Sequence, residues 1–138
     1  MLRKVRHLFK QLFRLNADLS DFNKEIFYVS TDNGVDLYVT TYTNRIDIAG
    51  LKVININLYF YDGSLITLYF LLDECKGRFD QVRKILEMKI QRKGKKIQRE
   101  HTAAYKWDNS REVLVILIDK DDDNKIKLYH SLLEYSVY

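Results

Sequence analysis

The chain has 138 residues, of which 46% are hydrophobic and 30% are charged, and its formal net charge is +4. This length suits a single domain over residues 1–138, and the composition excludes both a disordered chain and a membrane span. The sequence has no proline and only five glycines, which argues against two domains joined by a linker.

The cysteine content bears on the compartment. Cys75 is the only cysteine, so an internal disulfide framework is excluded and a reducing compartment is the simpler interpretation. The basic first residues are never apolar for long enough to resemble a signal peptide, and no later run could span a bilayer. We therefore expect a soluble, cytoplasmic protein.

Charge is segregated along the chain. Residues 1–16 hold five Lys/Arg and no acid, residues 17–75 hold three against nine acids, and residues 76–101 hold ten against three. The two basic stretches are the two with helical spacing, so the modest net charge hides a marked separation.

The first predicted element is a basic amphipathic helix, because apolar residues recur at helical spacing from Leu2 to Leu15. A polar loop leads to a predicted strand over 26–31. Asp32-Asn33-Gly34 is a hairpin signal, since Asn and Gly tolerate the positive φ of tight turns, and a return strand is predicted over 35–43.

The next predicted hairpin has the clearest pattern. Apolar residues alternate with polar residues or tyrosines from Ile54 to Phe60, and with Thr67, Tyr69 and Leu71 from Ile66 to Leu72. Both apolar rows share one face only if Phe60 lies opposite Ile66 and Leu58 opposite Leu68. This register requires a three-residue loop over 62–64 or a β-bulge beside the turn, and we expect the three-residue loop.

The second half of the chain begins with another basic helix. Apolar spacing predicts this helix from Phe79 to Ile90, ending near Gly94 as a C-cap. Strands are predicted over 103–107, 113–118 and 126–133. The order α-ββββ-α-βββ predicts an α+β fold: an antiparallel, meander-built sheet with two basic amphipathic helices on one face.

Catalytic and metal-binding patterns are absent from the sequence. It contains no phosphate loop, no dinucleotide fingerprint and no zinc-ligand spacing, so we expect no cofactor, no metal and no enzymatic activity. Residues 119–124 resemble the start of a calcium loop, but Asn124 and His130 stand where the glycine and glutamate are needed. We interpret this stretch as a solvated hairpin loop.

Two surfaces are candidates for partner contacts. Tyrosine gives a large contact area at low entropy cost, so tyrosines on the sheet face away from the helices could bind a partner, or could simply pack across strands. The second surface is residues 83–99, which hold eight Lys/Arg against Glu87 alone and could neutralise phosphates or form a solvated helix face and loop. The candidate residues are Tyr59, Tyr61, Tyr69, Arg83, Lys84, Arg92, Lys93, Lys95, Lys96 and Arg99.

The order of elements from residue 50 onward resembles a known group. An apolar meander over 53–65, a helix ending in Lys93-Gly94-Lys95, a strand bearing Trp107 and the run Leu128-Tyr129-His130-Ser131 are similar to those of small uncharacterised bacterial α+β proteins. Many of those proteins end the helix with Tyr-Gly and a proline, whereas Arg92-Lys93 precede Gly94 here. The resemblance implies the fold and a bacterial origin, and it implies no active site.

Together these patterns predict a non-catalytic binding or accessory module that acts through protein–protein contact. The alternative is a nucleic-acid-binding domain that uses residues 83–99, which a steep loss of affinity with salt would support. The C-terminal strand could also pair with its copy in a homodimer, if it lies at a sheet edge.

Overall fold

The computed structural model describes residues 14–22, 26–40, 47–48, 50–73 and 76–138. These residues form one antiparallel sheet of nine strands, with one α-helix and two short 3-10 helices. The strands are β1 (Ile26–Asp32), β2 (Val35–Thr40), β3 (Asp47–Ile48), β4 (Leu51–Tyr61), β5 (Ser64–Leu72), β6 (Lys95–Gln98), β7 (Thr102–Asp108), β8 (Glu112–Asp119) and β9 (Asp122–Leu132). The helices are α2 (Phe79–Ile90), η1 (Leu19–Asp21) and η3 (Leu133–Tyr135).

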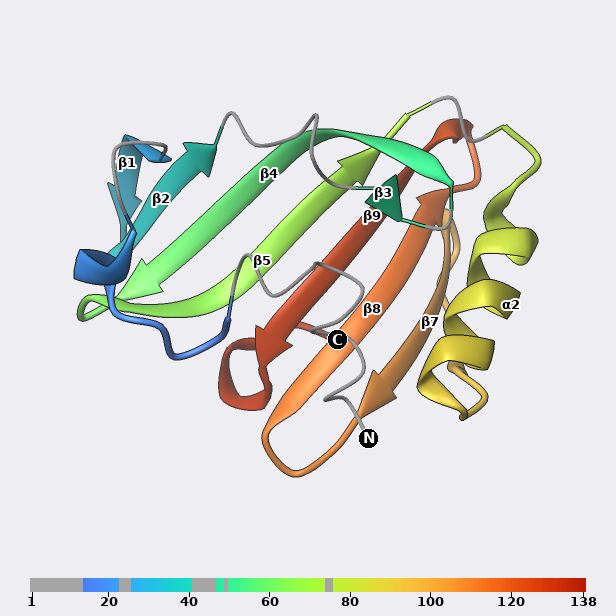
Figure 1. The fold of residues 1–138 in the computed structure, drawn as a ribbon. Helices are drawn as coiled ribbons and strands as arrows, with labels where there is room; N and C mark the ends of the chain where they lie inside the picture. Colours follow the sequence, from blue (N-terminus) through green and yellow to red (C-terminus); the bar gives the residue numbers. More distant parts are fainter. Residues whose placement is uncertain (1–13, 23–25, 41–46, 49, 74–75) are drawn as a thin grey trace.

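The strand order is β1-β2-β4-β5-β9-β8-β7-β6, with β3 paired to β4 (Figure 1). The last strand therefore lies in the middle of the sheet, where it joins β5 to β8. This position corrects the expectation that the C-terminal strand could offer an edge for dimerisation. Among the described strands, β1 and β6 end this order.

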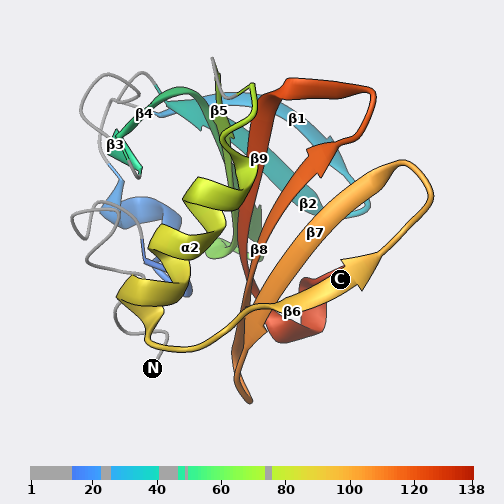
Figure 2. The ribbon, with the colours of Figure 1, turned by 90° about the vertical axis from the view of Figure 1, so that its right-hand side faces the viewer.

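Two layers cover the sheet. Helix α2 packs on one face, which we call the helix face, and the C-terminal residues lie on the opposite side, which we call the open face (Figure 2). The main core lies on the helix face, where Leu58, Phe60, Leu68 and Phe70 are fully buried, and it includes Val82, Leu86 and Ile90 of α2. A smaller core of Ala104, Val113, Val115 and Leu117 lies on the open face.

The predicted antiparallel sheet is confirmed, and so is its first hairpin. Asn33 and Gly34 both have positive φ, at 51° and 79°, which is the conformation that a two-residue turn between twisted strands requires. The first predicted helix falls almost wholly on residues outside the described ranges, and Leu15 and Asn16 form a turn. Among the described residues, none of the helices has the length and apolarity to cross a membrane.

The β4–β5 hairpin differs from the prediction in its turn. Leu58 lies opposite Leu68 as expected, but Phe60 lies opposite Leu65, because a two-residue turn at Asp62-Gly63 is combined with a register shift beside it. The alternative with a β-bulge is correct and the expected three-residue loop is wrong. A second shift between Val53 and Asn55 places Val53 in the core and leaves Ile54 38% exposed.

Helix α2 forms over the predicted residues, but Gly94 is not its C-cap. Gln91 takes the left-handed conformation with φ of 63°, and its N–H donates to the Glu87 carbonyl. Residues 95–98, expected as a charged loop, form the edge strand β6. The predicted loop over 119–124 is shorter than expected, since β8 and β9 continue to Asp119 and from Asp122.

Candidate binding sites

The open-face tyrosines lie on neighbouring strands in the centre of the sheet. Tyr59 of β4 pairs with Thr67 of β5, and Tyr69 of β5 pairs with Tyr129 of β9. The rings of Tyr69 and Tyr129 are 4.9 Å apart between centroids. The structure therefore brings Tyr59 and Tyr69 together on one face, as the alternation of β4 and β5 predicted.

The chain covers these tyrosines with its own C-terminal residues. The ring of Tyr135 lies 5.9 Å from that of Tyr61, and the ring of Tyr138 lies 6.0 Å from that of Tyr129. The Ser136 hydroxyl accepts a hydrogen bond from the Tyr138 N–H at 3.1 Å, which holds this segment in a turn. Residues 135–138 are thus a strap across the open face.

A cavity of about 320 Å³ lies between this strap and the sheet. Its walls are aromatic and aliphatic, except for the hydroxyls of Ser136, Thr67 and Ser131, and the oxygens of the last two are 2.8 Å apart. The cavity is lined by Val35, Tyr59, Ile66, Thr67, Tyr129, Ser131, Tyr135, Ser136, Val137 and Tyr138.

Burial raises the pKa of two phenols on this face. Desolvation, with smaller contributions from the neighbouring phenols of Tyr69, Tyr138 and Tyr59, raises the pKa of Tyr129 to about 12. Desolvation also raises the pKa of Tyr69, with a smaller contribution from Tyr59. At neutral pH the tyrosines can donate hydrogen bonds and stack, and they carry no charge.

Cations stand beside Tyr138. The guanidinium carbon of Arg99 lies 4.7 Å from the centroid of the Tyr138 ring, and Lys106 Nζ lies 3.2 Å from the main-chain oxygen of Tyr138. Lys106 is also 3.6 Å from a carboxylate oxygen of Asp108. Lys95 lies directly opposite Lys106 in the β6–β7 register.

The arginines of the basic stretch 83–99 have partners within the chain. Arg83 donates to Glu87 at 2.9 Å and lies 4.8 Å from the Tyr105 ring. Arg92 donates to the Asp108 carbonyl at 2.6 Å. Arg99 stacks on Tyr138, so these three arginines hold α2, β6, β7 and the strap together.

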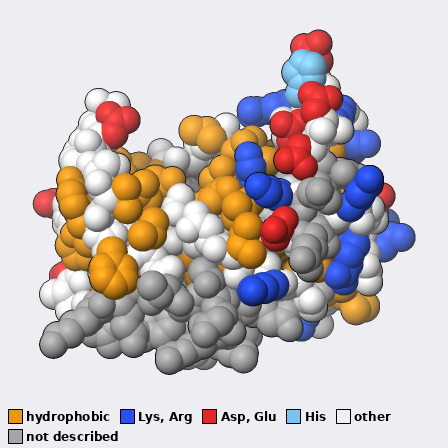
Figure 3. Space-filling model, turned by 90° about the horizontal axis from the view of Figure 1, so that it is seen from above, with side chains coloured by type: hydrophobic (Ala, Val, Ile, Leu, Met, Phe, Trp, Pro, Cys, Tyr) orange, Lys and Arg blue, Asp and Glu red, His pale blue; other side chains and the backbone are white. Residues whose placement is uncertain are grey.

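The lysines of the same stretch are the part that faces solvent. Lys84 is exposed on α2, Lys93 is exposed before β6, and Lys95 and Lys96 are exposed on β6. Figure 3 shows that Lys and Arg side chains gather at the end of the molecule that carries α2. Arg92 and Arg99 are also exposed, so the basic candidate residues differ in their contacts: the arginines have partners within the chain, and the lysines extend into solvent.

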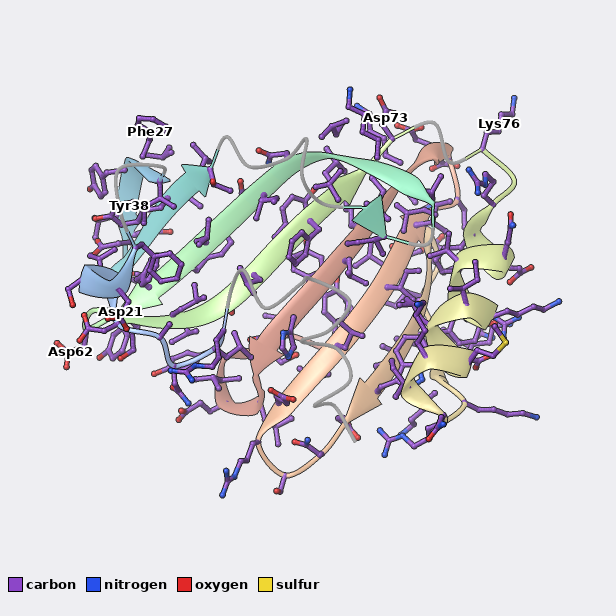
Figure 4. The ribbon with its side chains drawn as sticks, viewed as in Figure 1. Asp21, Phe27, Tyr38, Asp62, Asp73 and Lys76 are labelled. Atoms are coloured by element: carbon purple, nitrogen blue, oxygen red, sulfur yellow. The ribbon has the colours of Figure 1, made fainter. Side chains whose placement is uncertain are left out.

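The opposite edge of the sheet is apolar. In β1 the exposed fractions of Phe27, Tyr28 and Val29 are 52%, 57% and 52%. Figure 4 shows Phe27 at the outer limit of the sheet, and hydrophobic side chains gather at this end in Figure 3. The only charged residue of β1 is Asp32, at the turn.

Sequence reasoning missed the contribution of the C-terminal residues to the open face. Tyr129 lies in the strand predicted over 126–133, but no local pattern places it beside Tyr69. Only the pairing of β9 with β5, across about 60 residues of chain, does so, and Tyr138 then contacts Tyr129. In the described ranges, no group of three His, Cys, Asp or Glu could hold a metal ion, and Cys75 lies outside those ranges.

Comparison with known proteins finds no match to the chain among family models, curated proteins or solved structures.

Proposed function

We propose that this chain is a non-catalytic binding module that acts through contact with another protein, and that β1 is its contact surface. The observation that carries the proposal is the exposure of Phe27, Tyr28 and Val29, which are consecutive and each more than half exposed. Exposed apolar clusters of this kind mark interaction sites more often than isolated exposed side chains do.

The contrast between the two sheet edges supports this choice. Lysines on an edge strand discourage pairing with another chain, and β6 carries Lys95 and Lys96. Residues 26–31 of β1 carry no charge. A register shift between Tyr28 and Ser30 interrupts the regular pairing of β1 with β2, so a partner would contact side chains as much as backbone.

The test introduces lysines into β1, because the lysines of β6 already discourage pairing of that edge with another chain. The double variant Phe27→Lys/Val29→Lys should lose the protein that the wild type captures stoichiometrically from nuclease-treated lysate. Met88→Lys is the matched control, because Met88 is 74% exposed on α2 and lies away from β1. Capture that is unchanged in the double variant would refute β1 as the contact surface.

The partner could be a second copy of the chain, as the predicted homodimer would require. Sedimentation of the wild type would then show a concentration-dependent dimer, and the double variant would sediment as a monomer.

Two features of the sequence complete the proposal. The single cysteine, Cys75, supports a cytoplasmic location for this contact. The apolar spacing from Leu2 to Leu15 supports a second basic helix in the fold.

Nucleic-acid binding is the second candidate, and the solvent-facing lysines favour it. Lys84, Lys93, Lys95 and Lys96 could contact phosphates, whereas the three arginines have partners within the chain. Fluorescence anisotropy with single- and double-stranded oligonucleotides should then show affinity that falls steeply with salt. Lys95→Glu/Lys96→Glu should abolish that binding and Lys52→Glu, an exposed position on β4, should retain it; weak binding equal in both variants would refute it.

A further inference from the structure

The cavity under the strap has the dimensions and the lining of a small-molecule site. Its volume of about 320 Å³ is at the lower end of the range for ligand pockets. Strands β2, β4, β5 and β9 provide one wall and residues 135–138 provide the other. A single copy of the chain therefore forms the whole cavity. The site is separate from the exposed apolar residues of β1.

The lining favours an apolar ligand body. None of the ten lining side chains is charged at neutral pH. The hydroxyl of Ser131 is already hydrogen-bonded, at 2.8 Å to Thr67 and 2.9 Å to the Leu132 carbonyl, so it requires no polar group from a ligand. Tyr59 and Tyr129 offer ring surfaces to a chain or a ring of the ligand.

The surroundings of Tyr138 favour an anionic group on that ligand. Tyr138 lines the cavity and also contacts Arg99 and Lys106, so it stands between the apolar cavity and the cations. Lys95 faces Lys106 directly across the β6–β7 pair, and like charges in that position repel each other. Asp108, at 3.6 Å from Lys106, offsets only part of this positive charge.

We propose that this cavity binds a small amphiphilic organic anion, with its apolar body among the tyrosines and its carboxylate beside Lys106 and Arg99. The site accepts one short chain or ring, because its volume is only about 320 Å³ and the strap covers part of the sheet. Val137, which is 80% exposed, stands at the rim where the ligand would enter.

Calorimetric titration with octanoate and with 1-octanol tests both halves of the proposal. Octanoate should bind the wild type at one site, and the uncharged alcohol should bind about tenfold more weakly, which corresponds to 1.4 kcal/mol. Lys106→Gln should reduce octanoate affinity to that of octanol. Equal affinities for the acid and the alcohol in the wild type would overturn the anionic requirement.

The location of the site is tested by filling the cavity. Val35→Trp should abolish octanoate binding, since Val35 lines the cavity, whereas Val39→Trp on the same strand and face should retain it. Methyl NMR shifts of Val35 and Val137 on adding octanoate to the wild type provide a readout independent of any variant. No shift at these methyls, or undiminished binding in Val35→Trp, would overturn the site.

Anionic lipids in a membrane also combine apolar chains with negative charge. A vesicle-binding experiment distinguishes a membrane surface from a free ligand. Cosedimentation with phosphatidylcholine vesicles that contain phosphatidylserine, without any binding of octanoate, would overturn the proposal of a free ligand. Phe27→Lys/Val29→Lys should bind octanoate like the wild type. The ligand site and the protein contact at β1 can therefore fail separately.

Discussion

Gly94 and Trp107 lie against each other where the chain leaves α2 and enters β6. The indole N–H of the fully buried Trp107 donates to the Arg92 carbonyl at 2.8 Å. A Cβ on Gly94 would lie 2.8 Å from Cζ2 of Trp107 and 3.1 Å from Cβ of Tyr105. The requirement for glycine here is steric, since the Gly94 φ is not in the left-handed region.

Gly94→Ala should therefore destabilise the fold by about 1–3 kcal/mol, because an overpacked core must shift to accept the methyl group. Urea unfolding would measure the loss, and the emission of Trp107 should change in the folded state. Gly63→Ala is the control: its Cβ would meet nothing within 4 Å, but its φ of +77° makes alanine strained. Gly63→Ala should cost about 1 kcal/mol and leave Trp107 emission unchanged; the same result for Gly94→Ala would contradict the steric account.

Tyr129 should make the fold sensitive to alkaline pH. Its pKa is about 12 in the folded chain, against 10.0 for an ordinary tyrosine, because burial disfavours the phenolate. Between these two values the unfolded chain loses the Tyr129 proton and the folded chain keeps it. The free energy of unfolding should then decrease as pH rises from 10 to 12, and it is unaffected by this group below pH 10.

Tyr129→Phe removes the ionisable hydroxyl and should flatten this decline. Urea midpoints measured across the alkaline range would show a shallower slope for the variant than for the wild type. At about pH 8 the Tyr129 hydroxyl is protonated in both the folded and the unfolded wild type. The difference in free energy of unfolding between the variant and the wild type at that pH therefore reports the effect of packing alone. Identical slopes for the two proteins would show that Tyr129 is not responsible for the alkaline sensitivity.

Among the contacts between elements, the junction of α2 with β6 depends on Glu87. Its carboxylate accepts from Arg83 at 2.9 Å and from the Gly94 N–H at 2.8 Å, so it ties the helix to the segment that follows. Glu87 and Arg83 are mostly buried, with side-chain exposures of 16% and 19%. Removing one member of such a pair leaves the other without its partner.

Glu87→Ala should destabilise the chain by about 1–3 kcal/mol in urea unfolding, since both Arg83 and the Gly94 N–H lose an acceptor. Asp80→Ala is the matched control on the same helix. Asp80 is 3.6 Å from Arg83 but 73% exposed, and exposed ion pairs contribute about 0–1 kcal/mol. Equal losses in the two variants would mean that Glu87 acts only as a surface charge.

The elements that could be predicted are those with a local signal in their own residues. Strand β5 follows from alternation, helix α2 from helical spacing and strand β8 from an unbroken apolar run over 113–118. Strands β1 and β2 flank the turn signal at Asn33-Gly34. The register shift near the start of β4, which changes the alternate residues that face the core, could not be predicted. Val53 and Ile54 are both β-branched and apolar, so either side chain suits the core. Strand β6 has no apolar alternation, since an edge strand with Lys95 and Lys96 needs none.

The candidate sites depended on information that a sequence does not carry locally. Alternation correctly placed Tyr59 and Tyr69 on the face away from α2. The cavity requires β9 to pair with β5 and residues 135–138 to return over the sheet, and neither event has a signal in the nearby residues. Pairing of distant segments is decided by the summed burial of the whole core.

At the scale of the whole molecule, the β5–β9 pairing joins the two halves of the sheet. Strands β1, β2, β4 and β5 come from residues before α2, and strands β6 to β9 come after it. The main core crosses this boundary, since Leu68 of β5 and Leu114 of β8 belong to one buried cluster with Trp107. A core shared in this way makes the stability of each half depend on the other.

Leu68→Ala tests this dependence, because Leu68 is fully buried in the first half and Trp107 reports from the second. The variant should lose about 2–5 kcal/mol. Urea unfolding followed by Trp107 fluorescence and by far-UV circular dichroism should give coincident transitions, both shifted to lower urea by the same amount. A fluorescence transition that stays at its wild-type midpoint while the dichroism transition moves would show that the two halves unfold separately. The sheet would then separate between β5 and β9, beneath the strap of residues 135–138.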